Sequence, residues 1–111
     1  MSDLPLTPEL LAVIAERFKA LAEPTRLRLL NALHEGGEKS ATELMEATGL
    51  GQANASKHLQ VLHAAGFVNR RKEGLFVYYS LAGEDVFALC DIMCGRLQAE
   101  GEARRALLSV R

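Results

Sequence analysis

The stretch from Ser40 to Leu81 most restricts what this chain can fold into, because glycines divide it into short segments. Ser40-Ala41-Thr42-Glu43 is a capping box, in which the serine hydroxyl and the glutamate carboxylate accept hydrogen bonds from free backbone amides at a helix start. This helix should end at Gly49, and a second helix of about Gln52 to Ala65 should end at Gly66. The pattern predicts a helix-turn-helix over about residues 40–65.

A β-hairpin should follow the second helix. Phe67-Val68 and Phe76-Val77-Tyr78-Tyr79 are rich in β-branched and aromatic residues, and they flank the turn-forming pair Glu73-Gly74. We therefore expect an antiparallel hairpin over about residues 67–81, with the polar stretch Arg70 to Gly74 at its tip. A helix-turn-helix followed by such a hairpin is the winged helix-turn-helix arrangement, in which the hairpin is the wing.

Further helices should flank this stretch. Thr7-Pro8-Glu9 is an N-cap followed by proline, and the helix it begins should end near Ala22 because Pro24 disfavours helical geometry at the residue before it. Pro24 then opens a helix that Gly36-Gly37 stops. The last helix should cover about residues 83–99, since apolar residues recur there at helical spacing. The predicted fold is mainly α, a single domain with five helices and a two-stranded wing.

Positive charge is concentrated within the helix-turn-helix and hairpin. The 111-residue chain has a formal net charge of −1. Residues 1–50 hold five Lys or Arg against eight Asp or Glu, and residues 73–111 hold four against six. Residues 51–72 hold four Lys or Arg and no acidic residue. Local cations set affinity for phosphates, so this pattern favours DNA binding despite the neutral total, although chance clustering on a solvated surface is the alternative.

The second helix of the pair has a polar face suited to reading DNA. Its hydrogen-bonding side chains opposite the apolar positions are Gln52, Asn54, Ser56, Lys57, His58 and Gln60. Asn and Gln pair bidentately with adenine, while Lys suits guanine or phosphate. We expect Asn54 and Ser56 to read bases, whereas His58 has a structural hydrogen-bonding role as an equal alternative. Arg70, Arg71 and Lys72 of the hairpin should contact phosphate or the minor groove, with a solvated strand end as their alternative.

Several segments together resemble one family of bacterial regulators. Residues 18–30 read FKALAEPTRLRLL, residues 55–62 read ASKHLQVL, and residues 65–68 read AGFV. This combination resembles the ArsR/SmtB family of winged-helix repressors. The resemblance implies a homodimer joined through its first and last helices, bound to a double-stranded DNA operator. It also implies that a ligand or oxidation relieves repression by changing the dimer.

The chain departs from the metal-sensing members of this family. Those members often carry Cys-x-Cys in the helix that starts near Ser40, where this chain reads Glu43-Leu44-Met45-Glu46. Others have Asp and His ligands along the last helix, but the three histidines, His34, His58 and His63, all lie outside it. Neither metal site carries over, so no cofactor is assigned on the resemblance.

Cys90 and Cys94 are the remaining candidates for a chemical sensor. They lie four residues apart, so both sulfurs should stand on one side of the last helix, where small apolar residues commonly just pack. The alternative is a thiol site, in which two helices pairing across a dimer axis bring four sulfurs together. Four thiols can hold a soft metal or metalloid, or be oxidised between subunits.

Other classes of protein fit the sequence poorly. No apolar run approaches the ~20 residues that span a bilayer, and the N-terminus lacks a basic segment followed by an apolar one, so we expect a cytoplasmic protein without membrane contact. No Gly-rich phosphate loop, nucleophile elbow or paired-carboxylate site is present, so we do not expect an enzyme. The absence of zinc-finger spacing excludes the metal-folded finger class. Two alternatives to a sensing repressor stay open: a winged-helix protein-interaction module, and a repressor that senses neither metal nor redox state.

Overall fold

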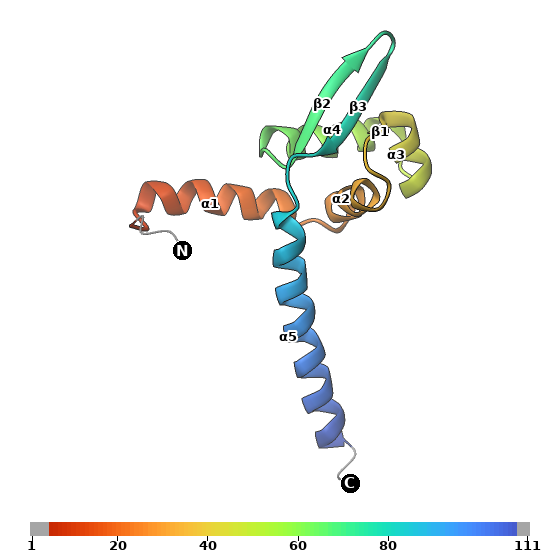
Figure 1. Cartoon of the computed structure of the whole chain (residues 1–111). Coiled ribbons are helices and arrows are strands. Elements are labelled where there is room, and N and C mark those ends of the chain that lie inside the picture. The colour runs from red at the N-terminus through yellow and green to blue at the C-terminus, as the bar shows by residue number, and fades with distance from the viewer. Residues whose placement is uncertain (1–4, 109–111) are drawn as a thin grey trace.

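The computed structural model describes residues 5–108 and contains five helices and a three-stranded antiparallel sheet (Figure 1). The helices are α1 (Pro8–Leu21), α2 (Pro24–Gly36), α3 (Ala41–Thr48), α4 (Gln52–Ala64) and α5 (Asp85–Leu108). The strands are β1 (Lys39–Ser40), β2 (Val68–Glu73) and β3 (Phe76–Leu81), in the order β1-β3-β2. The predicted winged helix-turn-helix is confirmed, with α3 and α4 as the helix pair and β2–β3 as the wing.

Local capping groups set the helix boundaries, as the sequence predicts. The Thr7 hydroxyl accepts a hydrogen bond from the Leu10 amide at 3.1 Å at the start of α1. In the capping box of α3, the Ser40 hydroxyl accepts from the Glu43 amide at 3.1 Å and the Glu43 carboxylate accepts from the Ser40 amide at 2.8 Å. Gly49 then ends α3 with a positive φ of 75°, a left-handed conformation that glycine adopts without steric cost.

The wing differs from its prediction in two ways. Its turn lies at residues 74–75, so Arg70 and its neighbours belong to strand β2 and not to the hairpin tip. A third strand, β1, pairs with β3 through Lys39 opposite Tyr79 and Ser40 opposite Tyr78. Two residues are too short for a recognisable strand pattern, since alternation needs several positions. This added strand ties the base of the wing to the segment between α2 and α3.

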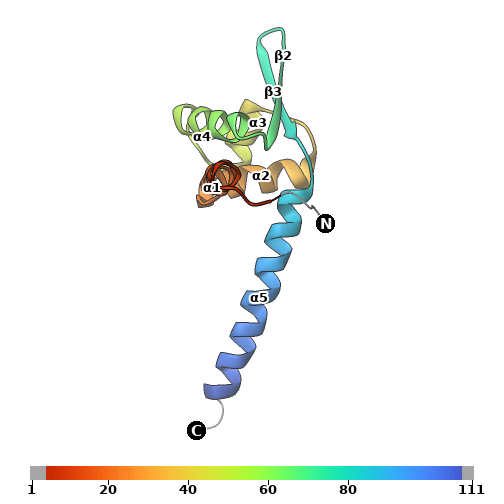
Figure 2. The same ribbon diagram turned by 90° about the vertical axis from the view of Figure 1, so that its left-hand side faces the viewer.

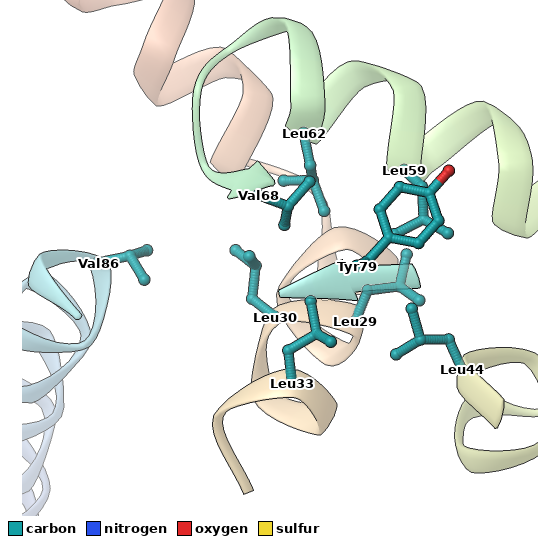
Figure 3. Close-up of a cluster of buried hydrophobic side chains, with 9 residues drawn as sticks. All are labelled: Leu29, Leu30, Leu33, Leu44, Leu59, Leu62, Val68, Tyr79 and Val86. Atoms are coloured by element: carbon teal, nitrogen blue, oxygen red, sulfur yellow. The ribbon is translucent and has the colours of Figure 1, made fainter. Parts of the chain in front are cut away.

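The core lies around α2 and holds the helix pair and the wing in place. Fully buried leucines from α2, α3 and α4 meet side chains from the wing and from the start of α5 (Figure 3). The cluster consists of Leu29, Leu30, Leu33, Leu44, Leu59, Leu62, Val68, Tyr79 and Val86. Because α4 contributes its apolar stripe to this cluster, its other side faces outward.

The last helix extends away from this body. Figures 1 and 2 both show α5 leaving on the side opposite to the wing. It runs to Leu108, farther than predicted, and Gly95 and Gly101 do not end it. Only its first turn joins the core, where Val86 is buried and Phe87 stacks on His34 with a ring-centroid distance of 4.0 Å. No helix in the described part of the chain is long and apolar enough to cross a membrane.

Candidate DNA-binding interface

The outer face of α4 carries most of the predicted polar residues in exposed positions. Gln52, Asn54, Ser56, Lys57 and Gln60 are all exposed, while Ala55, Leu59 and Leu62 are buried on the opposite side. The helix contains no carboxylate. This face therefore presents hydrogen-bonding groups and one cation, with nothing that repels phosphate.

His58 has partners inside the protein. Its side chain is only 12% exposed, and its Nδ1 lies 3.2 Å from an Arg26 guanidinium nitrogen. Arginine can only donate, so Nδ1 accepts and the ring proton is on Nε2, 3.5 Å from a Glu23 carboxylate oxygen. Glu23 also accepts from the Thr25 amide, which is the main cause that lowers the pKa of this carboxyl. Of the two roles considered for His58, the structure favours the structural one: it joins α4 to the start of α2.

The pleat of the wing separates its basic residues onto two faces. Arg70 lies opposite Tyr79 in the strand register, and Arg71 lies opposite Tyr78. Residues directly opposite each other share a face, and alternate residues share it too. Arg70, Lys72 and the buried Tyr79 are therefore on one face of the wing, and Arg71 is on the other.

Arg71 is occupied by carboxylates on its face. Its guanidinium donates to both oxygens of Glu38 at 2.7 and 2.8 Å and to Glu73 at 3.2 Å, and it lies 4.6 Å above the Tyr78 ring centroid. The hydrogen bond with Glu38 is the main cause that raises the pKa of Arg71 and lowers that of Glu38. Arg70 and Lys72 have no ion pair among residues 5–108. The wing cations that are available to a ligand are thus on the Tyr79 face.

Sequence reasoning missed Glu38 as the partner of Arg71. The two residues are 33 positions apart, and Glu38 precedes the short strand β1, which no pattern indicated. The same reasoning gave no role to Tyr79. Its only visible signal was its place in an aromatic strand, which predicts packing.

The cysteines lie on the exposed part of α5. Cys90 and Cys94 are both free and exposed, within a run from residue 88 to residue 100 in which every side chain is exposed. Within the described residues, no group of three or more His, Cys, Asp or Glu side chains is placed to hold a metal ion. One chain therefore offers two thiols and no complete metal site.

Known proteins share this fold and much of this sequence. A family model described as a helix-turn-helix domain matches residues 21–71. The HTH-type transcriptional regulator Rv0324 of Mycobacterium tuberculosis is 41% identical, but the match covers 76% of this chain and 38% of that protein. A probable mercury resistance operon repressor of Streptomyces lividans is 36% identical, with 81% of this chain and 82% of that protein covered.

A solved structure agrees over nearly the whole chain. The homodimeric winged helix-turn-helix DNA-binding domain Mb0332 of Mycobacterium bovis, a possible ArsR-family regulator, matches with a TM-score of 0.74 at 35% identity. The match covers 90% of this chain and 95% of that chain. This similarity agrees with the exposed polar face of α4 and with the wing beside it. The chain therefore belongs to the ArsR/SmtB family, a family of DNA-binding winged helix-turn-helix transcriptional regulators and not a class of enzymes.

Proposed function

We propose that this protein is a homodimeric repressor that binds a specific DNA operator through α4 and the wing. The observation that carries the proposal is the outer face of α4, which is exposed, polar and free of carboxylates. A helix of this kind enters the major groove, where hydrogen-bonding side chains distinguish base pairs. A mobility-shift assay on the DNA upstream of its own gene, against random duplex of equal length, tests this function.

Base reading is assigned to Asn54 and Ser56, with Gln52, Lys57 and Gln60 beside them. We expect Asn54→Ala to weaken operator binding by about tenfold and to relax the preference at one base position, because one bidentate contact discriminates by roughly 1–3 kcal/mol. Asn31→Ala, at an exposed position of α2, is the matched control and should leave binding unchanged. Equal losses on operator and random duplex for Asn54→Ala would contradict its base-reading role.

Phosphate contacts are assigned to the wing. Arg70→Ala and Lys72→Ala should each weaken binding to all sequences and reduce the slope of log affinity against log salt by about one. Arg71→Ala should change this slope less, because Glu38 and Glu73 already neutralise that guanidinium. A larger change in slope for Arg71→Ala than for Arg70→Ala would reverse the assignment.

Dimerisation is assigned to α1 and α5. Phe18 on α1 and Ile92 on α5 are 56% and 62% exposed, and further apolar residues are exposed on both helices. Large apolar surfaces of this kind are commonly covered by a partner. We expect a dimer in analytical ultracentrifugation and a monomer for Ile92→Glu. The relative from Mycobacterium bovis is homodimeric, which supports the expectation of a dimer.

A protein-interaction module is the alternative function. It would account for the apolar helices, but it needs neither the polar face of α4 nor the unpaired cations of the wing. Absence of binding to the upstream region and to random duplex at low salt would favour this alternative. If the protein stays bound to the operator but leaves random duplex as the salt concentration rises, the protein-interaction module is excluded.

Detection of the chemical signal is assigned to Cys90 and Cys94, whose thiols would bind a soft metal ion or metalloid. Both thiols are exposed on one side of α5, so a second copy of this helix would complete a site of four sulfurs. Binding releases a proton from each coordinating thiol. The mercury resistance repressor among its relatives agrees with a thiol-binding ion.

The test compares the wild type with Cys90→Ser/Cys94→Ser. Mercuric ion or arsenite should release the wild type from DNA and leave the double variant bound. Release of both proteins would exclude the cysteines. If neither these ions nor zinc or peroxide release the wild type, the protein is a repressor that does not sense through its thiols.

A further inference from the structure

A polar hollow lies between α4, the proposed recognition helix, and the wing. It has a volume of about 380 Å³ and is lined by Ser56, Gln60, His63, Arg70 and Tyr79. Two of these residues, His63 and Tyr79, have no part in the DNA contacts assigned above. We refer to this feature as the α4–wing hollow.

Two periodicities bring these side chains together. Ser56, Gln60 and His63 are spaced at i, i+4 and i+7, so they share one side of α4. Arg70 and Tyr79 are directly opposite each other on β2 and β3, so they share the face of the wing that meets the core. Packing of α4 against the wing through Leu59, Leu62 and Val68 then sets the two groups face to face.

Tyr79 brings a hydrogen-bonding group to the hollow. The residue is only 6% exposed and its ring belongs to the hydrophobic cluster (Figure 3). This hydroxyl has no hydrogen-bond partner among residues 5–108. Every fully buried side-chain oxygen and nitrogen there has a partner, so the Tyr79 hydroxyl is accessible at the surface. The hydroxyl therefore reaches the hollow, where an acceptor from outside the chain can bind it.

The chemistry of the lining selects an anion. Each of the five side chains can donate a hydrogen bond, and none is a carboxylate. Arg70 adds a full positive charge that no acidic residue in the described chain neutralises. Donors around a cation match a phosphodiester, and the volume leaves space for the sugar beside it.

We propose that the α4–wing hollow seats one backbone phosphate of the operator in each half-site, with Tyr79 and His63 as phosphate-binding residues beside Arg70. The inference rests on the proposed DNA binding and adds a fixed position of α4 relative to the DNA backbone. A phosphate held between α4 and the wing fixes how deeply the helix enters the groove, so base-reading side chains arrive at a set position. Tyr79 links this contact directly to the core.

The test uses operator duplexes in which one phosphate at a time is replaced by an uncharged methylphosphonate. Tyr79→Phe removes only the hydroxyl and leaves the ring in the core, and Tyr78→Phe on the opposite face of the wing is the matched control. We expect Tyr79→Phe and His63→Ala each to weaken binding to unmodified operator by about tenfold to a hundredfold, as for loss of a hydrogen bond to a charged group. Tyr78→Phe should bind like the wild type.

Coupling to a single phosphate is the decisive result. One methylphosphonate position in each half-site should weaken the wild type by about tenfold and have a much smaller effect on Tyr79→Phe, because the contact is already lost. If Tyr79→Phe and His63→Ala bind unmodified operator as tightly as the wild type, the inference is wrong while DNA binding stands. Equal sensitivity of wild type and variants at every position would also overturn it. Failure of the wild type to bind DNA would refute the proposed function itself.

Discussion

Leu59→Ala gives a quantitative test of how the core holds the recognition helix. Leu59 projects from α4 into the core and is 1% exposed. The substitution removes three carbon groups at about 0.8 kcal/mol each, a transfer loss of roughly 2.4 kcal/mol. The surrounding leucines cannot fully close the space, and the remaining cavity raises the total to about 3–5 kcal/mol. This is a large part of the 5–15 kcal/mol typical of a domain.

The assay is urea denaturation followed by circular dichroism, with the chain concentration fixed because a dimer gains stability with concentration. Leu75→Ala is the matched control, since Leu75 is 96% exposed at the wing turn and its loss should change the free energy of unfolding by less than about 0.5 kcal/mol. The midpoint of Leu59→Ala should fall with an unchanged urea dependence. A loss below about 1 kcal/mol would show that α4 is not packed as described.

Other predictions concern caps, protons and the wing. Ser40→Ala should cost about 1 kcal/mol in the free energy of unfolding, measured in urea, because it removes the hydroxyl half of the α3 capping box. The pKa of Glu43 is lowered, mainly by the hydrogen bond from the Ser40 amide, so the unfolded state binds a proton more readily than the folded state. Its stabilising contribution is complete above the unfolded pKa of about 4.3 and disappears as pH falls through the folded value, so unfolding midpoints from pH 6 to 3 should drop less steeply for Glu43→Gln. Arg71→Ala should speed amide hydrogen exchange in β2 while leaving exchange in α4 unchanged, since it removes the contact between the wing and Glu38.

Local patterns predicted most of the fold. The capping box at Ser40 and Glu43, the prolines at helix starts and the glycine at position 49 act on backbone groups within a few residues. Their effects can therefore be read without knowing what packs nearby. The strand β1 escaped prediction because its two residues are too few to show alternation, and it exists through pairing with Tyr78 and Tyr79.

The candidate site was predicted less completely. The exposed face of α4 followed from helical periodicity, because the leucines on the other side had to be buried. The difference between Arg70 and Arg71 did not follow, since it depends on the strand register and on Glu38. The partners of His58 were likewise unpredictable, because Arg26 lies 32 positions away along the chain.

The sequence by itself thus determined the order of the five helices and of the two strands of the wing, the concentration of cations in residues 51–72 and the polar face of α4 that first indicated DNA binding. The tertiary structure decided which cations are available, which histidine is structural, and that Ser56, His63 and Tyr79 line one hollow. The physical reason is the range of the interactions. Caps and periodicity act within a few positions of the chain, whereas ion pairs, strand register and cavities depend on residues that only the packed core brings together.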